Sequence, residues 1–163
     1  MLSAVTSALY RQRMSRISIR VATAQDAEPI AQLSGTLGYS ASTEVMRQRL
    51  GTILKLPSEL LIVALDSNNR VIGWLQAHAS HVIESGFRVE IMGLIVSPEV
   101  RRCGVGRSLV QEAERWATAQ SAPAIVVRSN VQRIESHAFY PALGYAAAKT
   151  QNVYRKTLAK THS

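Results

Sequence analysis

Residues 91–96 form an unbroken apolar stretch, IMGLIV, that leads into a loop and then into a helical pattern. A strand that is apolar on both faces belongs in the interior of a sheet, where neither face meets water. The loop, residues 101–106, contains two glycines, and apolar residues recur at helical spacing from Val105 to Ala117. A central strand that leads into such a helix restricts the chain to an α/β fold.

The remaining pattern predicts about seven strands and about four helices. Thr23 and Asp26 have the spacing of a capping box, and Ser42 is a suitable cap for a second helix. The expected helices cover residues 23–36, 42–54, about 105–117 and 131–143. The expected strands are 17–22, 59–65, 70–82, 87–97, 124–128, 145–148 and 152–158. Most of the strands before the loop follow one another directly, so the front half of the sheet should be antiparallel.

The length of 163 residues suits one domain, expected over residues 16–160, after a flexible leader over residues 1–15. The leader is basic and free of acid, which also resembles a transit peptide, but Met14 as an alternative start is the simpler interpretation. One cysteine excludes an intrachain disulfide, and the scattered histidines do not form a metal site. We therefore expect a cytoplasmic protein without a metal.

The net charge of +8 favours acidic partners such as a nucleotide-like cofactor or a nucleic acid. The basic residues do not form a run with interleaved aromatic residues, so we expect no nucleic-acid partner. No apolar run approaches the roughly 20 residues that span a bilayer, so we expect no membrane partner.

The loop has the features of a phosphate-binding site. Glycines let the backbone approach a ligand, and a helix N-terminus offers unpaired N–H donors and a partial positive charge. Neither the third glycine of a dinucleotide fingerprint nor the Gly-Lys-Ser/Thr of a Walker loop is present. The candidate phosphate-binding residues are Arg101, Arg102, Cys103, Gly104, Val105, Gly106, Arg107 and Ser108.

The segment 101–106, RRCGVG, resembles the acetyl-CoA pyrophosphate loop of the GNAT superfamily of N-acetyltransferases. The resemblance implies that acetyl-CoA is the cosubstrate and that Leu94, Ile95 and Val96 pair through their backbone with its pantetheine arm. It also implies a mixed sheet that splays between the fourth and fifth strands. A homodimer is a further expectation, taken from the habit of the family.

A second segment, residues 133–145, resembles the other cofactor motif of that family, a helix that ends in Tyr and Leu-Gly-Tyr. Arg133, Ser136 and Tyr140 are spaced by three and four residues, so they share one helix face. The resemblance implies that Arg133 and Ser136 bind the cofactor. Pro141 departs from the family pattern and should bend the helix. The resemblance covers residues 17 to about 158.

Acetyl transfer to an amine requires a base, an oxyanion donor and an acid for the leaving thiolate. The resemblance implies that Tyr140 is the acid and Glu90 the base. A distortion of the central strand near Gly93 and Leu94 could supply the oxyanion donor. His78 or His81 could instead relay the proton through water. Tyr39 and His78 are the candidate contacts to the acceptor.

The expected function is thus direct transfer of an acetyl group from acetyl-CoA to a primary amine of a small molecule or peptide. The alternative is a non-catalytic sensor that binds acyl-CoA on the same fold, since a fold does not determine a function. The pattern does not identify the acceptor amine.

Overall fold

The structure, a computed structural model, describes residues 17–158. The leader expected over residues 1–15 lies outside these residues. The described chain divides between Arg128 and Ser129 into two compact units.

The first unit contains one five-stranded sheet in the order β1-β2-β3-β4-β5. Its strands are β1 (Ser18–Val21), β2 (Glu59–Leu65), β3 (Val71–Val82), β4 (Gly86–Val96) and β5 (Ile125–Val127). The first three pairings are antiparallel, and β4 pairs with β5 in parallel. The expected mixed sheet with an antiparallel front half is therefore present.

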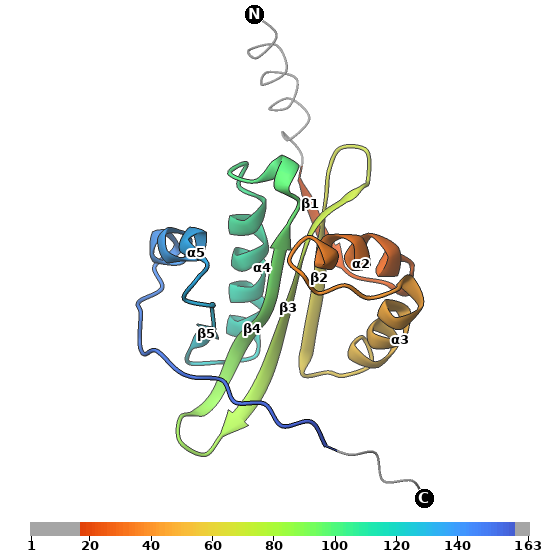
Figure 1. Ribbon diagram of the computed structural model, residues 1–163. Coiled ribbons are helices and arrows are strands. Elements are labelled where there is room, and N and C mark those ends of the chain that lie inside the picture. Colours follow the sequence, from red (N-terminus) through yellow and green to blue (C-terminus); the bar gives the residue numbers. More distant parts are fainter. Residues whose placement is uncertain (1–16, 159–163) are drawn as a thin grey trace, which may run out of the picture. The chain divides into compact units, whose positions relative to one another are not determined.

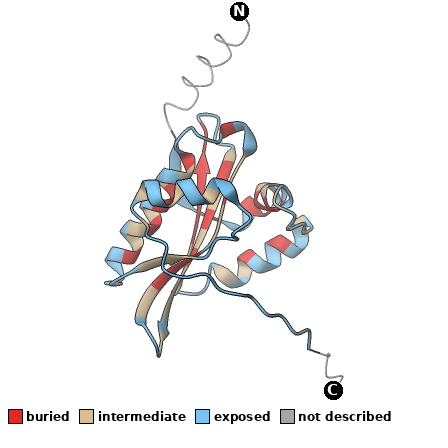
Figure 2. Ribbon diagram, turned by 60° about the vertical axis from the view of Figure 1, so that its left-hand side comes forward, coloured by how far each residue is buried: buried red, intermediate tan, exposed pale blue. Residues whose placement is uncertain are grey.

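Helices cover both faces of this sheet (Figure 1). On one face lie α2 (Ala27–Gly35) and α3 (Thr43–Ile53), and on the other lies α4 (Val105–Ala119). Buried residues concentrate on the strands and on the inward sides of these helices (Figure 2). The cluster beneath α2 and α3 consists of Ala22, Ala27, Ile30, Ala31, Met46, Leu50, Leu61, Val63 and Leu65.

Local sequence explains how the helices begin and how closely they pack. The Ser42 hydroxyl accepts a hydrogen bond from the Val45 amide at 3.2 Å, so Ser42 caps α3 as expected. Gly73 on β3 lies under α4. A Cβ there would come within 2.9 Å of the Ile95 carbonyl oxygen and 3.3 Å of Leu109 Cδ1. Glycine at this position thus allows α4 to approach the sheet closely.

The second unit begins at Ser129 and contains α5 (Ile134–Phe139) and a short 3₁₀ helix, η3 (Pro141–Leu143). The prediction of a single helix over residues 131–143 is therefore wrong, since α5 covers only Ile134–Phe139. Pro141 has no N–H to continue an α-helix, and it occupies the first turn of η3 instead. Gly144 ends this turn with a φ of 90°, which glycine adopts without strain.

The two strands expected at residues 145–148 and 152–158 are absent from the described chain. Residues 17–158 contain five strands rather than about seven, whereas their four α-helices agree with the expected number. Val153 and Tyr154 are each 90% exposed. Alternation in sequence is not enough for a strand, because a strand also needs a neighbour to pair its N–H and C=O groups.

No helix among residues 17–158 is long and apolar enough to cross a membrane.

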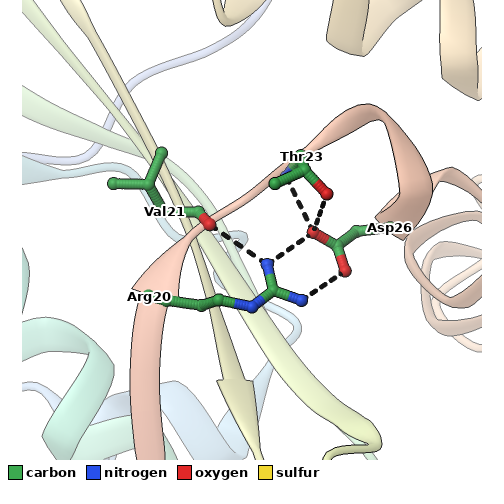
Figure 3. Close-up of polar contacts among 4 residues, drawn as sticks. All are labelled: Arg20, Val21, Thr23 and Asp26. Carbon is green, nitrogen blue, oxygen red and sulfur yellow. Dashed lines mark hydrogen bonds and ion pairs between the residues drawn. The ribbon is translucent and has the colours of Figure 1, made fainter.

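A buried carboxylate fixes the connection from β1 to α2 (Figure 3). Asp26 accepts hydrogen bonds from both terminal nitrogens of Arg20, at 2.7 and 2.8 Å, and from the Thr23 amide at 2.7 Å. The hydrogen bonds from Arg20 hold the pKa of Asp26 below its ordinary value, against the opposing effect of burial. The reciprocal bond expected of a capping box, from the Thr23 amide to Asp26, is therefore present.

We expect Asp26→Asn to lower the free energy of unfolding at pH 7 by about 2 kcal/mol, because it leaves Arg20 without its carboxylate. A carboxylate whose pKa is lower in the folded state stabilises above its unfolded pKa, and this contribution disappears as the pH falls through the folded value. The difference between wild type and variant should therefore shrink below about pH 4. Urea denaturation at pH 7 and pH 3 measures both effects.

Glu44→Gln is the matched control, because Glu44 pairs with Arg47 on the surface, where both side chains are more than half exposed. Its effect should stay below about 0.5 kcal/mol. Equal losses in the two variants at pH 7 would show that Asp26 has no special part in this connection.

Candidate functional site

The central strand β4 changes its surroundings halfway along its length. It pairs with β5 only through Val89, Glu90 and Ile91. Its pairing with β3 shifts at the same point, since Gln76 faces Gly93 whereas Ala77 faces Ile91. Met92 is therefore the extra residue of a β-bulge, next to the distortion expected at Gly93 and Leu94.

Beyond Ile91, β4 has an edge without a strand partner among the described residues. The edge covers residues 92–96, which span about 16 Å at the usual rise of a strand. Leu94 and Val96 are half-buried, and Ile95 is buried. An extended ligand that contains amide groups can pair with such an edge through backbone hydrogen bonds.

The loop after β4 presents backbone donors at the start of α4. Arg102 and Gly104 both have positive φ, 63° and 85°. For a non-glycine residue such as Arg102 this conformation is strained, and such strain concentrates at functional sites. Gly104 is the N-cap of α4, and no side chain caps the helix. The first N–H groups of α4 have no carbonyl one turn earlier, so they can bind an anion.

The side chains around this loop agree with an exposed anion site. Arg101, Arg102, Cys103 and Arg107 are exposed, and Gly106 and Ser108 are half-buried. Val105 is buried and anchors the first turn of α4 in the core. The loop residues proposed from the sequence are thus adjacent in space as well as in sequence.

A row of ionisable side chains crosses the three central strands. Glu59 on β2 faces His78 on β3, and His78 faces Glu90 on β4. Residues directly opposite one another project from the same face of a sheet. Trp74, four residues before His78, packs against the cluster under α2 and α3, so the row lies on that same face.

Glu90 is buried and its two oxygens are occupied. Arg88 Nη2 lies 3.2 Å from Oε2, and Arg128 Nη1 lies 3.0 Å from Oε1. The Arg88 side chain is 20% exposed and that of Arg128 is 59% exposed. Glu90 can accept a proton only by weakening at least one of these two ion pairs, which counts against a simple role as a base.

Glu59 is a site residue that the sequence analysis did not identify. Its Oε1 lies 2.6 Å from His78 Nδ1, and its Oε2 accepts a hydrogen bond from Gln76 at 2.9 Å. The Glu59 side chain is 10% exposed, so it has few other partners available. The sequence did contain an indication of this role. Glu59 is the first residue of an otherwise apolar strand, and a carboxylate at the end of a buried strand needs a partner.

The other candidates on this unit lie outside the row. Tyr39 is 63% exposed in the connection between α2 and α3. His81 stacks on Phe87, with 4.7 Å between the ring centroids, near the turn between β3 and β4. The structure therefore gives Tyr39 and His81 no contact with Glu90 or His78.

The second unit brings its three candidate residues onto one short helix. Arg133 is the N-cap of α5, Ser136 lies in its first turn, and Tyr140 follows its last residue. The Tyr140 amide bonds to the Ser136 carbonyl at 3.3 Å. Burial raises the pKa of the Tyr140 phenol, against the opposing charge of Arg133. The phenol therefore keeps its proton at neutral pH and can act as a donor.

Within residues 17–158 no group of three or more His, Cys, Asp or Glu residues could hold a metal ion. What the first unit does offer is a basic loop at an uncapped helix N-terminus, a strand edge without a described partner and a row of titratable side chains.

Known proteins resemble this chain in sequence. The family model for the acetyltransferase (GNAT) family matches residues 25–145, which is more than half of the chain. An aminoglycoside N(6')-acetyltransferase type 1 of Acinetobacter baumannii is 24% identical over 119 residues, 71% of this chain and 82% of that protein. An aminoalkylphosphonate N-acetyltransferase of Salmonella typhimurium is 28% identical over 142 residues, 84% of this chain and 92% of that protein.

Solved structures share the fold. The structure of AAC(6')-Iy in complex with a bisubstrate analogue, CoA-S-monomethyl-acetylneamine, matches with a TM-score of 0.78 and 21% identity, over 88% of this chain and 100% of that chain. The aminoglycoside 6'-N-acetyltransferase AAC(6')-Ih of Acinetobacter baumannii matches with a TM-score of 0.77 and 20% identity, over the same shares. Together with the family match, they show that this chain belongs to the GNAT family of acetyltransferases.

Proposed function

We propose that this acetyltransferase transfers the acetyl group of acetyl-CoA directly to a primary amine of a small molecule or peptide. The observation that supports it most is the course of β4, from a bulge at Met92, along an open edge, to an uncapped helix N-terminus. An anionic pyrophosphate suits the helix end, and an extended arm with amide groups suits the strand edge.

In this proposal the pyrophosphate binds the backbone of the loop from Arg101 to Ser108, and the pantetheine arm pairs with Leu94, Ile95 and Val96. The arm then runs from the loop back toward the bulge. This direction brings its thioester to Met92 and Gly93, two or three residues from Glu90. The neighbouring structure with a CoA-containing bisubstrate analogue supports a common mode of cofactor binding.

The acceptor amine then approaches from the face that bears Glu90 and His78, with Tyr39 as a further proposed contact. Glu90 is the base that the resemblance implies, and His78 is the other group on this face that can take a proton. The two curated relatives described above are named for amines of small molecules, aminoglycosides and aminoalkylphosphonates. They support a small-molecule amine over a protein substrate.

The second unit contributes the acid. We propose that Tyr140 protonates the departing thiolate, and that Arg133 and Ser136 bind the cofactor. The raised pKa of the phenol supports this role, because a general acid must be protonated before it acts.

A screen of an amine library with acetyl-CoA, followed by mass spectrometry, tests the function. The library should include aminoglycosides, aminoalkylphosphonates, polyamines and peptides, and an acceptor should gain the mass of one acetyl group. Binding of acetyl-CoA without acetylation of any amine would favour the non-catalytic sensor instead.

We expect Gly104→Asp to abolish the rise in melting temperature that acetyl-CoA causes in the wild type, because a ligand of the folded state raises that temperature. The variant places a negative charge at the proposed phosphate site, at a backbone φ of 85°. Differential scanning fluorimetry with and without acetyl-CoA measures the change.

Gly104→Asn is the matched control, since Asn has the shape of Asp and the same tolerance of positive φ but no charge. It should retain part of the shift. A full shift in the Asp variant would remove the main support for the proposed cofactor site.

We expect Tyr140→Phe to lower turnover at saturating acetyl-CoA roughly 10²- to 10⁴-fold, the usual contribution of general acid catalysis. The ring and its edge contacts with Phe139 and Tyr145 are retained, so coenzyme A affinity should change little. Single-turnover kinetics isolates the chemical step.

Tyr154→Phe serves as the control, because Tyr154 is 90% exposed. Near-normal single-turnover rates in Tyr140→Phe would show that another group protonates the thiolate.

A further inference from the structure

The two ring nitrogens of His78 differ in their surroundings, because Glu59 contacts only Nδ1. A carboxylate oxygen lies 2.6 Å from Nδ1, a distance that requires a proton between the two atoms. In the neutral ring that proton belongs to Nδ1, and Nε2 then carries the lone pair. The ring orientation and its tautomer are therefore set by Glu59.

Glu59 is itself held in place. Gln76 donates a hydrogen bond to its second oxygen at 2.9 Å, from the residue two positions before His78 on β3. The carboxylate is 10% exposed, whereas the His78 side chain is 36% exposed. The buried partner is thus fixed and the ring reaches outward, and no described residue is bonded to Nε2.

Charged groups around His78 are few and identifiable. Glu59 lies on β2 and Glu90 on β4, each directly opposite His78. Arg88 and Arg128 both bind Glu90, so its carboxylate is already compensated by two cations. No arginine or other cation among residues 17–158 binds His78 Nε2, so its lone pair stays open to a proton. Of the three groups in the row, Glu59 and Glu90 each bind two side chains, whereas His78 Nε2 is bonded to no described residue and is therefore free to take a proton.

We infer that His78 Nε2 takes the proton from the acceptor ammonium, and that Glu59 is the positioning residue that presents this nitrogen. The inference rests on the proposed function and names its base. Glu90 then keeps Arg88 and Arg128 in place.

The proton balance is complete with groups already named. The ammonium gives one proton to Nε2 and becomes a neutral amine, while Glu59 stabilises the imidazolium that forms. The amine nitrogen attacks the thioester carbon, and a C–N bond forms as the C–S bond breaks. The proton that the amine nitrogen loses on forming the amide neutralises the departing thiolate. The imidazolium finally releases its proton to water.

We expect His78→Asn to lower turnover at pH 7 about 100-fold, without loss of the melting-temperature shift caused by acetyl-CoA. Asn retains a donor near the position of Nδ1 but has no basic nitrogen. Raising the pH should rescue the variant, because an alkylamine with a pKa of about 10.4 becomes neutral in solution by itself. Acceptor amines of lower pKa should also be acetylated better by the variant.

We expect Glu59→Gln to lower turnover roughly 10- to 100-fold, the usual effect of losing a partner that orients a functional histidine. The KM for the amine should change little. ¹⁵N NMR of the imidazole should show the Nδ1–H tautomer in the wild type and a mixture of tautomers in the variant. Gln76→Met, which removes only the second bond to Glu59, should give a smaller loss of the same kind.

His81→Asn is the matched control on the same strand, since His81 packs on Phe87 and contacts no carboxylate among residues 17–158. Its turnover should remain normal. Near-normal turnover in His78→Asn together with a large loss in Glu90→Gln would overturn the inference and make Glu90 the base. A wild type that acetylates no amine would instead overturn the proposed function. The NMR measurement still tests the pair of Glu59 and His78 in that case.

Discussion

The parallel pairing of β4 with β5 ends at Ile91, and the arrangement of the site depends on this one change. From Val89 to Ile91 both edges of β4 are paired, so the side chains of these residues are held in a continuous sheet. After it, the strand continues with one edge open and with an extra residue at Met92. The strand is closely packed at this transition, because a Cβ on Gly93 would come within 2.9 Å of the ring of Trp74. A strand that is half paired and half open offers both a rigid support and backbone groups for a ligand.

The charges of the first unit are arranged around that same point. Anion-binding groups lie beyond the open edge, at the start of α4, and the titratable row lies before it, across β2, β3 and β4. Each buried carboxylate of the row has its own partners, so the row is a set of separate pairs rather than a cluster of like charges. Two cations bind Glu90, whereas among the described residues His78 is hydrogen-bonded only through Nδ1. This difference in partners distinguishes His78 from Glu90.

Much of the fold could be predicted because its signals are local. The apolar runs of β2, β3 and β4 and the helical spacing from Val105 to Ala117 are periodic patterns, and caps such as Ser42 mark the helix starts. The strands expected after Gly144 are absent, because a strand needs a neighbour to pair its N–H and C=O groups and no described strand pairs with these residues. The helix expected over residues 131–143 is shorter for a different reason: it begins only at Ile134, and Pro141 interrupts it.

The sequence by itself determined the family, the antiparallel front half of the sheet and the strand–loop–helix unit around Arg101–Gly106, because each depends on residues that are adjacent in the chain. Only the tertiary structure decided the partners of the titratable groups. Glu59 and His78 are 19 residues apart in the chain, yet strand register brings their side chains to 2.6 Å. Arg128 is likewise far from Glu90 in the chain, and its Nη1 lies 3.0 Å from the Glu90 carboxylate. Register is set by packing over the whole sheet, and no local pattern contains it.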